Sequence, residues 1–322
     1  MALVFLFPGQ NSRYPGMIDK LADLHPGNAR LVERASDTLG RDLRAHFRAG
    51  NQRQFDRNRD VQVGVFLANE LMRATLERTG IEAAFSAGLS LGEYNHLVHI
   101  GALRFEDALV LLQARGDAYD EGPRGVMYAV HPIEAAELEP AVARAGRHRI
   151  AIGVHAAPRQ CVLSGGAAAV EAVIAEVESG FFVESSVVDP RLPMHSPLYD
   201  PVARRLAPAL EQTPFWMPWK PYLPNARGRF EPDTSACRLR ELLAMHVCRP
   251  VLWRESLEAI DAQVPDPVYV EVGVKSVLTN LMGRRWLDRP RFAPDREEGL
   301  EGHLARTIQE IKHAARRLAI AG

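Results

Sequence analysis

The sequence predicts an α/β protein, with a large domain built on a mostly parallel sheet and a smaller subdomain inserted into it. Three observations lead to this prediction. Short apolar runs typical of buried strands alternate with segments of helical spacing. Residues 125–188 predict a separate β-α-β-β-α-β order of strands and helices, distinct from the alternation in the rest of the chain. The length of 322 residues suffices for one large domain with an insertion.

The large domain begins with the apolar residues 2–7, which Pro8 and Gly9 bring to an end, and this is the pattern of a fully buried parallel strand. Helical segments follow between 17 and 47, and residues 61–78 have the apolar spacing of a long core helix. The remaining elements expected here are a strand over 81–87, a helix over 105–115, a strand over 268–272 and a terminal helix over 300–318.

The inserted subdomain is expected over residues 123–190, between 1–122 and 191–322 of the large domain. Strands are predicted over 126–130, 149–154, 160–163 and 181–188, and helices over 132–145 and 167–178. The resulting β-α-β-β-α-β order is the signature of a ferredoxin-like subdomain.

Composition excludes several classes of protein. A net charge of -1, from 39 basic and 40 acidic residues, gives no general attraction to nucleic acid or to an anionic membrane. Three cysteines are too few for a disulfide framework or a zinc cluster. The apolar N-terminus lacks the basic region of a signal peptide, and no apolar run approaches the ~20 residues of a membrane span. We therefore expect a cytoplasmic protein without a membrane partner.

The segment Gly88-Leu89-Ser90-Leu91-Gly92 matches the G-x-S-x-G nucleophile elbow, with a predicted strand before it and a helix after it. The glycines permit a sharp turn that exposes the serine hydroxyl. A serine is a weak nucleophile at neutral pH and needs a base. Among 11 histidines, His195 is the candidate because Pro193-Met194-His195-Ser196-Pro197 opens a new helical stretch. Each feature has an ordinary alternative: the G-x-S-x-G segment as a structural turn, and His195 as a surface or buried structural residue.

Further motifs lie in the same order along the chain. They are Phe7-Pro8-Gly9-Gln10, Ser90-Leu91-Gly92-Glu93-Tyr94, Gln113-Ala114-Arg115-Gly116, the QCVLSG of residues 160–165, His195-Ser196, Pro250-Val251-Leu252-Trp253 and Glu271-Val272-Gly273 with Val277-Leu278-Thr279. This series resembles the malonyl-CoA:acyl carrier protein transacylase family, which includes free-standing acyltransferases of polyketide synthases. The resemblance covers nearly the whole chain. It implies an α/β-hydrolase-like core with a ferredoxin-like insert.

The resemblance also implies roles for individual residues. Ser90 would carry the acyl group as an ester, and His195 would act as its base. The backbone carbonyl of His246, where the family has a glutamine, would orient His195. The backbone N–H groups of Gln10 and Leu91 would form the oxyanion hole. Arg115, which follows Ser90 by 25 residues, would bind the free carboxylate of a malonyl-type group.

We also expect Met127, Met194, His155 and Asn225 to contact the substrate. Two of these depart from the family pattern, since His155 replaces an asparagine and Met194 precedes the histidine where phenylalanine or serine is usual. Met194 is bulky but flexible and favours an unbranched acyl group. Leu89 replaces a histidine, Lys275 a glycine, and Asn11-Ser12-Arg13 the usual second half of the first motif. These departures suggest a specialised biosynthetic enzyme.

The predicted activity is therefore transfer of a malonyl group from coenzyme A to the phosphopantetheine thiol of an acyl carrier protein. Three alternatives remain: transfer of a larger or amino-acid-derived acyl group between carriers, hydrolysis of carrier thioesters, and a non-catalytic docking module. No metal or redox cofactor is implied. An acidic carrier protein predicts a basic rim, for which the candidates are Arg204, Arg205, Arg227, Arg284 and Arg285.

Overall fold

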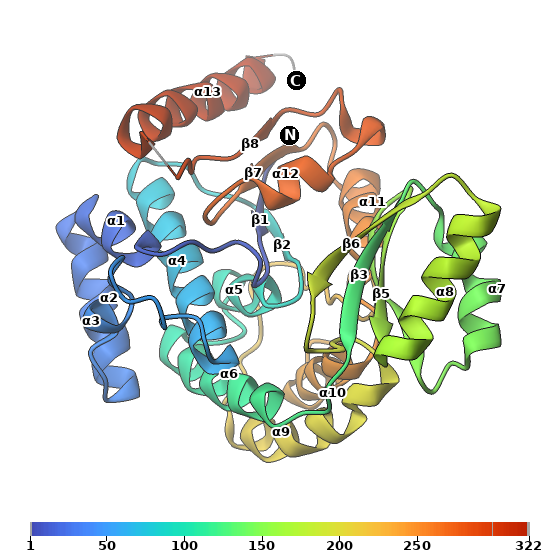
Figure 1. The fold of residues 1–322 in the computed structure, drawn as a ribbon. Coiled ribbons are helices and arrows are strands. Elements are labelled where there is room, and N and C mark those ends of the chain that lie inside the picture. Colours follow the sequence, from blue (N-terminus) through green and yellow to red (C-terminus); the bar gives the residue numbers. More distant parts are fainter. Residues whose placement is uncertain (1, 298, 321–322) are drawn as a thin grey trace. The chain divides into compact units, whose positions relative to one another are not determined.

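The computed structural model describes residues 2–297 and 299–320 of the chain (Figure 1). The chain divides into two compact units, and each is described by itself. Unit 1 comprises Met1–Asp117, Pro214–Tyr222 and Ile260–Gly322, and unit 2 comprises Ala118–Thr213 and Leu223–Ala259.

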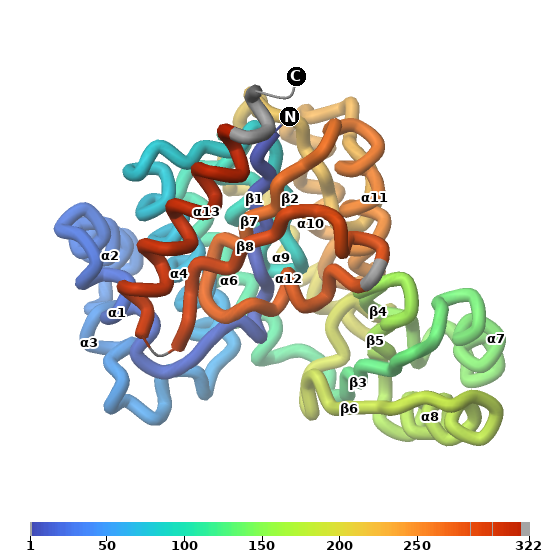
Figure 2. The backbone as a smooth tube through the Cα atoms, turned by 90° about the horizontal axis from the view of Figure 1, so that it is seen from above, coloured from blue at the N-terminus to red at the C-terminus, as the bar shows by residue number. Residues whose placement is uncertain are grey.

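Unit 1 is built on a four-stranded parallel sheet of the order β2-β1-β7-β8, whose strands follow one another in Figure 2. The strands are β1 (Leu3–Phe7), β2 (Phe85–Gly88), β7 (Val268–Glu271) and β8 (Arg291–Phe292). The register pairs Phe7 with Gly88 and Leu6 with Glu271, so the carboxyl ends of the three longer strands meet at one edge. The predicted parallel sheet is confirmed.

Helices surround this sheet in unit 1. They are α1 (Met17–Asp23), α2 (Pro26–Leu39), α3 (Leu43–His46), α4 (Asn58–Arg78), α5 (Gly92–His99), α6 (Phe105–Asp120), which runs into unit 2, α12 (Val277–Leu281), the 3-10 turn η2 (Arg284–Trp286) and α13 (Leu300–Ile320). The predicted long core helix corresponds to α4, which is buried along most of its length. The carboxylate of Glu271 accepts hydrogen bonds from the backbone of Leu278 and Thr279 and so fixes the start of α12 to the end of β7.

Unit 2 contains a four-stranded antiparallel sheet of the order β4-β5-β3-β6. Its strands are β3 (Val126–His131), β4 (Ile150–Ala157), β5 (Gln160–Gly165) and β6 (Glu184–Asp189), and α7 (Ala135–Ala145) and α8 (Ala167–Gly180) lie side by side against it in Figure 1. An apolar core that includes Val130, Leu138, Leu163 and Val173 fills the space between the helices and the sheet. The rest of the unit contains η1 (Pro197–Tyr199), α9 (Asp200–Gln212), α10 (Ala236–Cys248) and α11 (Trp253–Gln263), which ends in unit 1.

Two predicted strand starts differ from the structure, and each has a local cause. The strand predicted from residue 81 begins at Phe85, because the N–H of Ile81 bonds to the carbonyl of Leu76 and ends helix α4. The strand predicted from residue 181 begins at Glu184. Phe181 ends helix α8 and Phe182 is 97% exposed, so these two aromatic residues do not form part of a buried strand. Apolar character alone misplaced both boundaries.

Across the described part of the chain, none of the helices combines the length and the apolar character that a membrane span requires.

Candidate active site

Ser90 lies in unit 1 in the turn between β2 and α5. Its φ of 52° is left-handed, a conformation that residues other than glycine rarely adopt. The turn is closed by backbone hydrogen bonds from Gly92 to Leu89 and from Glu93 to Ser90, of 3.0 and 2.9 Å. The structure thus has a strained strand–turn–helix with a serine at its centre, the form that a nucleophile elbow takes.

The two glycines of this turn are required by close backbone contacts. A Cβ atom at Gly88 would lie 2.0 Å from the carbonyl carbon of Gly92, and one at Gly92 would lie 2.0 Å from the carbonyl oxygen of Phe7. No rotation of a side chain could relieve these contacts, because the atoms that would be met are backbone atoms. The glycines therefore allow β1, β2 and α5 to approach one another around Ser90.

Gln10 lies in the loop after β1, next to the elbow. The N–H of Leu89 donates to the carbonyl of Phe7 at 2.9 Å, and the Cα of Gly9 packs against Leu89 and Ser90. A side-chain hydrogen bond from Arg13 to the carbonyl oxygen of Gln10 also holds this loop. Gln10, Ser90 and Leu91 are thus brought together within unit 1, and Arg13, noted as a departure from the family pattern, supports the loop.

Arg115 on α6 is almost fully buried, with 1% of its surface exposed. Its Nη1 donates to Oε1 of Gln62 at 2.8 Å, and its guanidinium lies 5.4 Å from the ring centre of Tyr94. Both groups are uncharged, and these two contacts orient the guanidinium. A buried guanidinium held in this way is suited to a carboxylate ligand.

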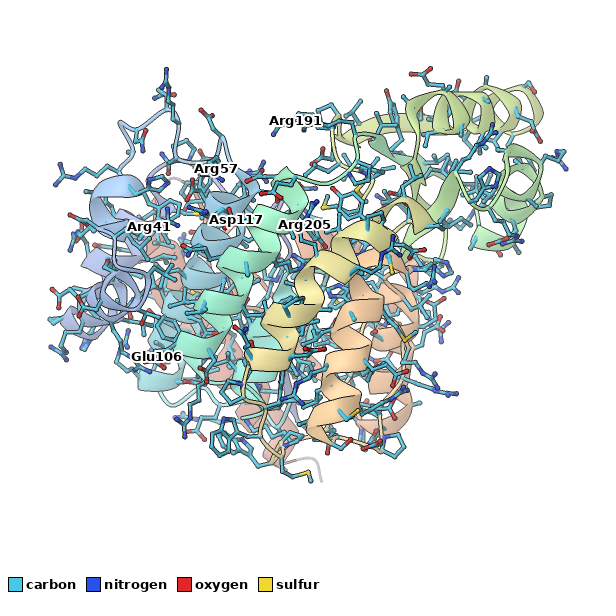
Figure 3. The ribbon with its side chains drawn as sticks, turned by 90° about the horizontal axis from the view of Figure 1, so that it is seen from below. Arg41, Arg57, Glu106, Asp117, Arg191 and Arg205 are labelled. Carbon is cyan, nitrogen blue, oxygen red and sulfur yellow. The ribbon has the colours of Figure 1, made fainter. Side chains whose placement is uncertain are left out.

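Helices α4 and α6 position Arg115 through direct backbone packing. A Cβ at Gly116 would lie 2.3 Å from the Cα of Arg59. The side chain of Arg59 forms two hydrogen bonds of 2.7 Å with Asp117, the residue after Gly116, and Arg57 reaches the same carboxylate at 3.2 Å, as the placement of Arg57 and Asp117 in Figure 3 illustrates. The bidentate pair fixes the rotation of α6 and thereby the direction of Arg115.

His195 lies in unit 2, between β6 and η1, and is 2% exposed. It also has a left-handed backbone, with a φ of 61°. Its Nδ1 is 2.8 Å from the carbonyl oxygen of His246, and its ring stacks on the His246 ring at a centroid distance of 5.1 Å. A carbonyl oxygen can only accept, so Nδ1 carries a proton, and in the neutral imidazole the lone pair is therefore on Nε2. The ring is thereby oriented to act as a base through Nε2.

The backbone around His195 is fixed by strand β4 and by the end of α10. The N–H of His195 donates to the carbonyl of Val247 at 3.2 Å. The Cα of Gly153 lies beneath the carbonyls of Met194 and His195, and the hydroxyl of Ser164 donates to the carbonyl of Met194. Met194 is buried, and so is Met127 at the start of β3, opposite Ser164.

His155 and Asn225 lie near the segment that follows α10. The N–H of His155 donates to the carbonyl of Val251 and that of Leu252 to the carbonyl of Asn225, both at 2.9 Å. Nδ1 of His155 is 2.8 Å from Oε1 of Glu255. Burial alone would raise the pKa of Glu255, but its hydrogen bond with His155 and the charge of Arg254 lower it overall. Unit 2 thus groups four of the predicted residues, His195, His246, His155 and Asn225, around one segment.

Comparison with known proteins identifies the family. A family model described as an acyl transferase domain matches residues 4–295. The chain belongs to the acyl transferase family. The malonyl CoA-acyl carrier protein transacylase of Salmonella typhimurium is 32% identical over 286 residues, which cover 87% of this chain and 91% of that relative. The family resemblance predicted from the ordered motifs is confirmed.

Solved structures of acyl transferases share the fold. A malonyl CoA-acyl carrier protein transacylase from Clostridium perfringens has a TM-score of 0.89 at 23% identity and covers 98% of this chain and 100% of its own. A type II polyketide synthase acyl-carrier protein in complex with its malonyl-transacylase provides a second match, with a TM-score of 0.86 at 26% identity, covering 96% of this chain and 100% of that one.

This acyl transferase has a second buried polar cluster on the inner side of α5. The hydroxyl of Ser86 lies 2.7 Å from Nδ1 of His96 and 2.8 Å from Nδ1 of His99, and the ammonium of Lys220 lies 3.0 Å from Nε2 of His99. Burial lowers the pKa of His96 to about 3, and burial together with the charge of Lys220 lowers that of His99 to about 2. Both imidazoles are therefore neutral, and the cluster joins β2 to α5 behind the elbow.

The candidate basic residues of the acyl transferase are distributed over both units. Arg204 and Arg205 are exposed on α9 of unit 2, where Arg205 lies 3.5 Å from Glu121 and is labelled in Figure 3. Arg227 is half-buried in the same unit, and Arg285 is exposed in unit 1. The side chain of Arg284 lies outside the described residues. Within the described residues, no group of three His, Cys, Asp or Glu side chains is arranged to hold a metal ion.

Sequence reasoning missed two residues that support the site. Gln62 accepts a hydrogen bond from Arg115, and its signal in the sequence was a polar amide between the apolar residues Val61 and Val63 of the predicted core helix. Ser164 donates a hydrogen bond to the carbonyl of Met194, the residue before His195, and it lies in the QCVLSG segment of residues 160–165. In both cases the polar residue was visible, but the partner that explains it is distant in sequence.

Proposed function

We propose that this acyl transferase moves a malonyl group from malonyl-CoA to the phosphopantetheine thiol of an acyl carrier protein, through an ester on Ser90. Nε2 of His195 takes the Ser90 proton as the hydroxyl oxygen attacks the thioester carbonyl. The N–H groups of Gln10 and Leu91 stabilise the resulting oxyanion. The intermediate then expels the coenzyme A sulfur, which takes the proton back from His195. The thiol of the carrier protein repeats the sequence in reverse and releases Ser90.

The observation that carries the choice of substrate is the buried guanidinium of Arg115. The planar guanidinium of an arginine binds a carboxylate through two parallel hydrogen bonds, and a malonyl group presents such a carboxylate. The neutral amide of Gln62 and the ring of Tyr94 keep the guanidinium in place between turnovers. An acetyl group has no carboxylate and would leave this charge without its ligand.

The proposal extends to the remaining predicted residues. His155, Asn225, Met127 and Met194 line the substrate side of unit 2, where Met194 disfavours a branched acyl group. The carbonyl of His246 orients His195 without an acidic third residue. The exposed Arg204, Arg205 and Arg285 are candidates for meeting an acidic carrier protein.

We also propose that residues 123–190 form a ferredoxin-like subdomain inserted into an α/β-hydrolase-like domain of residues 1–122 and 191–322. The strand order β4-β5-β3-β6 with α7 and α8 against the sheet supports the first assignment. The parallel sheet with a nucleophile elbow after β2 supports the second.

The central experiment is incubation with malonyl-CoA followed by intact-protein mass measurement. We expect a malonyl ester on Ser90 that persists until a carrier protein is added and that is absent from Ser90→Ala. Rapid loss of the ester to water would favour a hydrolase. No adduct from malonyl-CoA, but an adduct from an acylated carrier protein, would favour transfer between carriers. No adduct from either donor would overturn the proposal.

Arg115→Ala tests the carboxylate clamp. The loss of a charged hydrogen bond to the malonyl group should reduce the rate of malonyl transfer by about 100-fold, while acetyl transfer changes little. Steady-state rates with the two coenzyme A thioesters measure the difference. Equal losses on both substrates would remove this role from Arg115 and leave the Ser90 chemistry untouched.

A further inference from the structure

Asn69 lies in the middle of α4 and is fully buried. Its side-chain nitrogen Nδ2 donates to the carbonyl oxygen of Pro8 at 3.1 Å and to Oδ1 of Asn95 at 2.9 Å. Pro8 belongs to the loop after β1, and Asn95 belongs to α5. One amide nitrogen therefore connects two segments that are 87 positions apart in the chain.

These two segments carry the N–H groups to which the proposed function assigns the oxyanion. Gln10 follows Pro8 by two residues, and Leu91 precedes Asn95 by four, at the start of α5. An oxyanion hole stabilises the transition state only when both donors lie about 2.7–3.1 Å from the same oxygen. The separation of the two segments must therefore be fixed before the substrate arrives.

The surroundings hold the Asn69 amide in one orientation. The nitrogen of Asn95 donates to the carbonyl of Phe66 and to Oε1 of Glu70, at 3.1 and 2.8 Å, so the oxygen of Asn95 must face Asn69. A Cβ at Gly273 would lie 2.4 Å from Oδ1 of Asn69 and 2.5 Å from Cγ of Pro8, so neither group can retreat in that direction.

The Asn69 oxygen itself accepts no hydrogen bond from the residues that the structure describes, although it is buried. A buried acceptor without a donor reduces stability. The contribution of Asn69 is therefore the two hydrogen bonds of its nitrogen, since its oxygen makes none within the described residues. The geometry favours a role in placement over one in stability.

We propose that Asn69 is a positioning residue of this acyl transferase, which sets the distance between the oxyanion donors of Gln10 and Leu91. The inference rests on the proposed function, because it presupposes acylation of Ser90. Asn69 does not touch the substrate; it acts through the Pro8 carbonyl and through Asn95.

The test is Asn69→Asp in the full chain, which keeps the shape and replaces the donor nitrogen by an oxygen. Formation of the Ser90 ester is followed by quenched-flow mass measurement over a range of malonyl-CoA concentrations. We expect the acylation rate constant at saturation to fall by about 10- to 100-fold, with the half-saturating concentration changed less than twofold, because the oxyanion exists only in the transition state.

Gln54→Glu is the matched control. Gln54 is 1% exposed, its nitrogen donates to the carbonyls of Arg48 and Asn51 at 3.0 and 2.8 Å, and its oxygen also lacks a donor within the described residues. The same chemical change at Gln54 should lower the melting temperature and leave the acylation rate constant within twofold. If Asn69→Asp does not fold, Asn69→Ser is the second variant, because its hydroxyl keeps one donor. Its acylation rate constant should fall by about tenfold, with the half-saturating concentration changed less than twofold.

The outcomes separate the two levels of the proposal. A wild-type rate in Asn69→Asp, or equal losses in Asn69→Asp and Gln54→Glu, would overturn the role of Asn69 while acylation by the wild-type chain stands. Loss of substrate affinity at an unchanged rate constant would overturn it as well. The absence of a Ser90 ester in the wild-type chain would overturn the proposed function and this inference with it.

Discussion

The elbow around Ser90 and the region around His195 reach the same unusual backbone conformation by different means. At Ser90 the constraint is local and steric, because Gly88 and Gly92 lie within two positions and allow backbones to touch. At His195 the constraint is a backbone hydrogen bond from its N–H to the carbonyl of Val247, 52 positions away, together with the close packing of strand β4. A short motif can therefore specify the first region, whereas the second depends on the assembled unit.

The largest effect is expected from a substitution that removes the steric freedom of the turn around Ser90. Gly92→Ala would place a Cβ 2.0 Å from the Phe7 carbonyl oxygen, and we expect the free energy of unfolding to fall by about 3 kcal/mol or more. Gly50→Ala is the control, since a Cβ there meets nothing within 4 Å and should change stability by less than about 0.5 kcal/mol. Urea denaturation measures both. Equal stabilities would mean that the turn can relax.

The second prediction concerns the buried histidines behind the elbow. Because burial depresses their folded pKa values below the ordinary value of 6.5, the unfolded chain binds protons that the folded chain does not. Stability due to these groups is full above pH 6.5 and is lost as the pH falls toward 3. In His99→Gln the slope of unfolding free energy against pH should decrease by about 1.4 kcal/mol per pH unit between pH 6 and 4.

The control for this slope is His313→Gln, because His313 is exposed on α13. The comparison with wild type at each pH removes the contribution of Glu271, whose pKa burial raises to about 7, so that its own stabilising effect declines from pH 4.5 to 7. An unchanged slope in His99→Gln would show that His99 binds a proton in the folded state.

The third prediction sharpens the account of the His195 region. The carbonyl of residue 246 survives any side-chain change, so His246→Ala keeps this acceptor and removes the stacking contact with His195. An aromatic pair contributes about 0.5–1.5 kcal/mol, which corresponds to at most about a tenfold lower acylation rate. Single-turnover kinetics would measure it. A loss of a thousandfold would assign chemistry to the His246 side chain.

The smallest effect is expected at the edge of the same region. Glu255→Gln removes the charge opposite His155 and should lower the free energy of unfolding by about 1 kcal/mol at pH 7, since the pair is partly exposed. Because the pKa of Glu255 is depressed in the folded state, the difference between variant and wild type should decrease as the pH falls below 4.5. Thermal unfolding at pH 7 and pH 4 tests this.

Much of the fold could be predicted from the sequence because its signals are local. The run of residues 2–7, the spacing over 61–78 and the order of elements over 125–188 each depend on near neighbours. The departures were local too: α7 begins at Ala135 because Glu134 and Glu137 form a capping box, and Pro132 stays outside the helix.

The supports of the candidate site could not be predicted in this way. Gln62 accepts a hydrogen bond from Arg115, 53 positions away, and Asn69 donates one to Pro8, 61 positions away. No rule of sequence spacing relates such pairs. The left-handed backbone at His195 could not be predicted either, because glycine and asparagine are the usual sequence signals of this conformation and neither occupies the position. Long-range hydrogen bonds decide these features, and they become visible only when the chain is folded.

Helix α4 supplies both Gln62 and Asn69, and it is unbroken between Asn58 and Arg78. The two residues are seven positions apart, which is about 10.5 Å along a helix axis. Under the proposed function, this unbroken helix sets the spacing between the group that binds the substrate carboxylate and the group that receives the thioester carbonyl. A substrate of another length would require different side chains at these two positions, because the length of the helix is fixed.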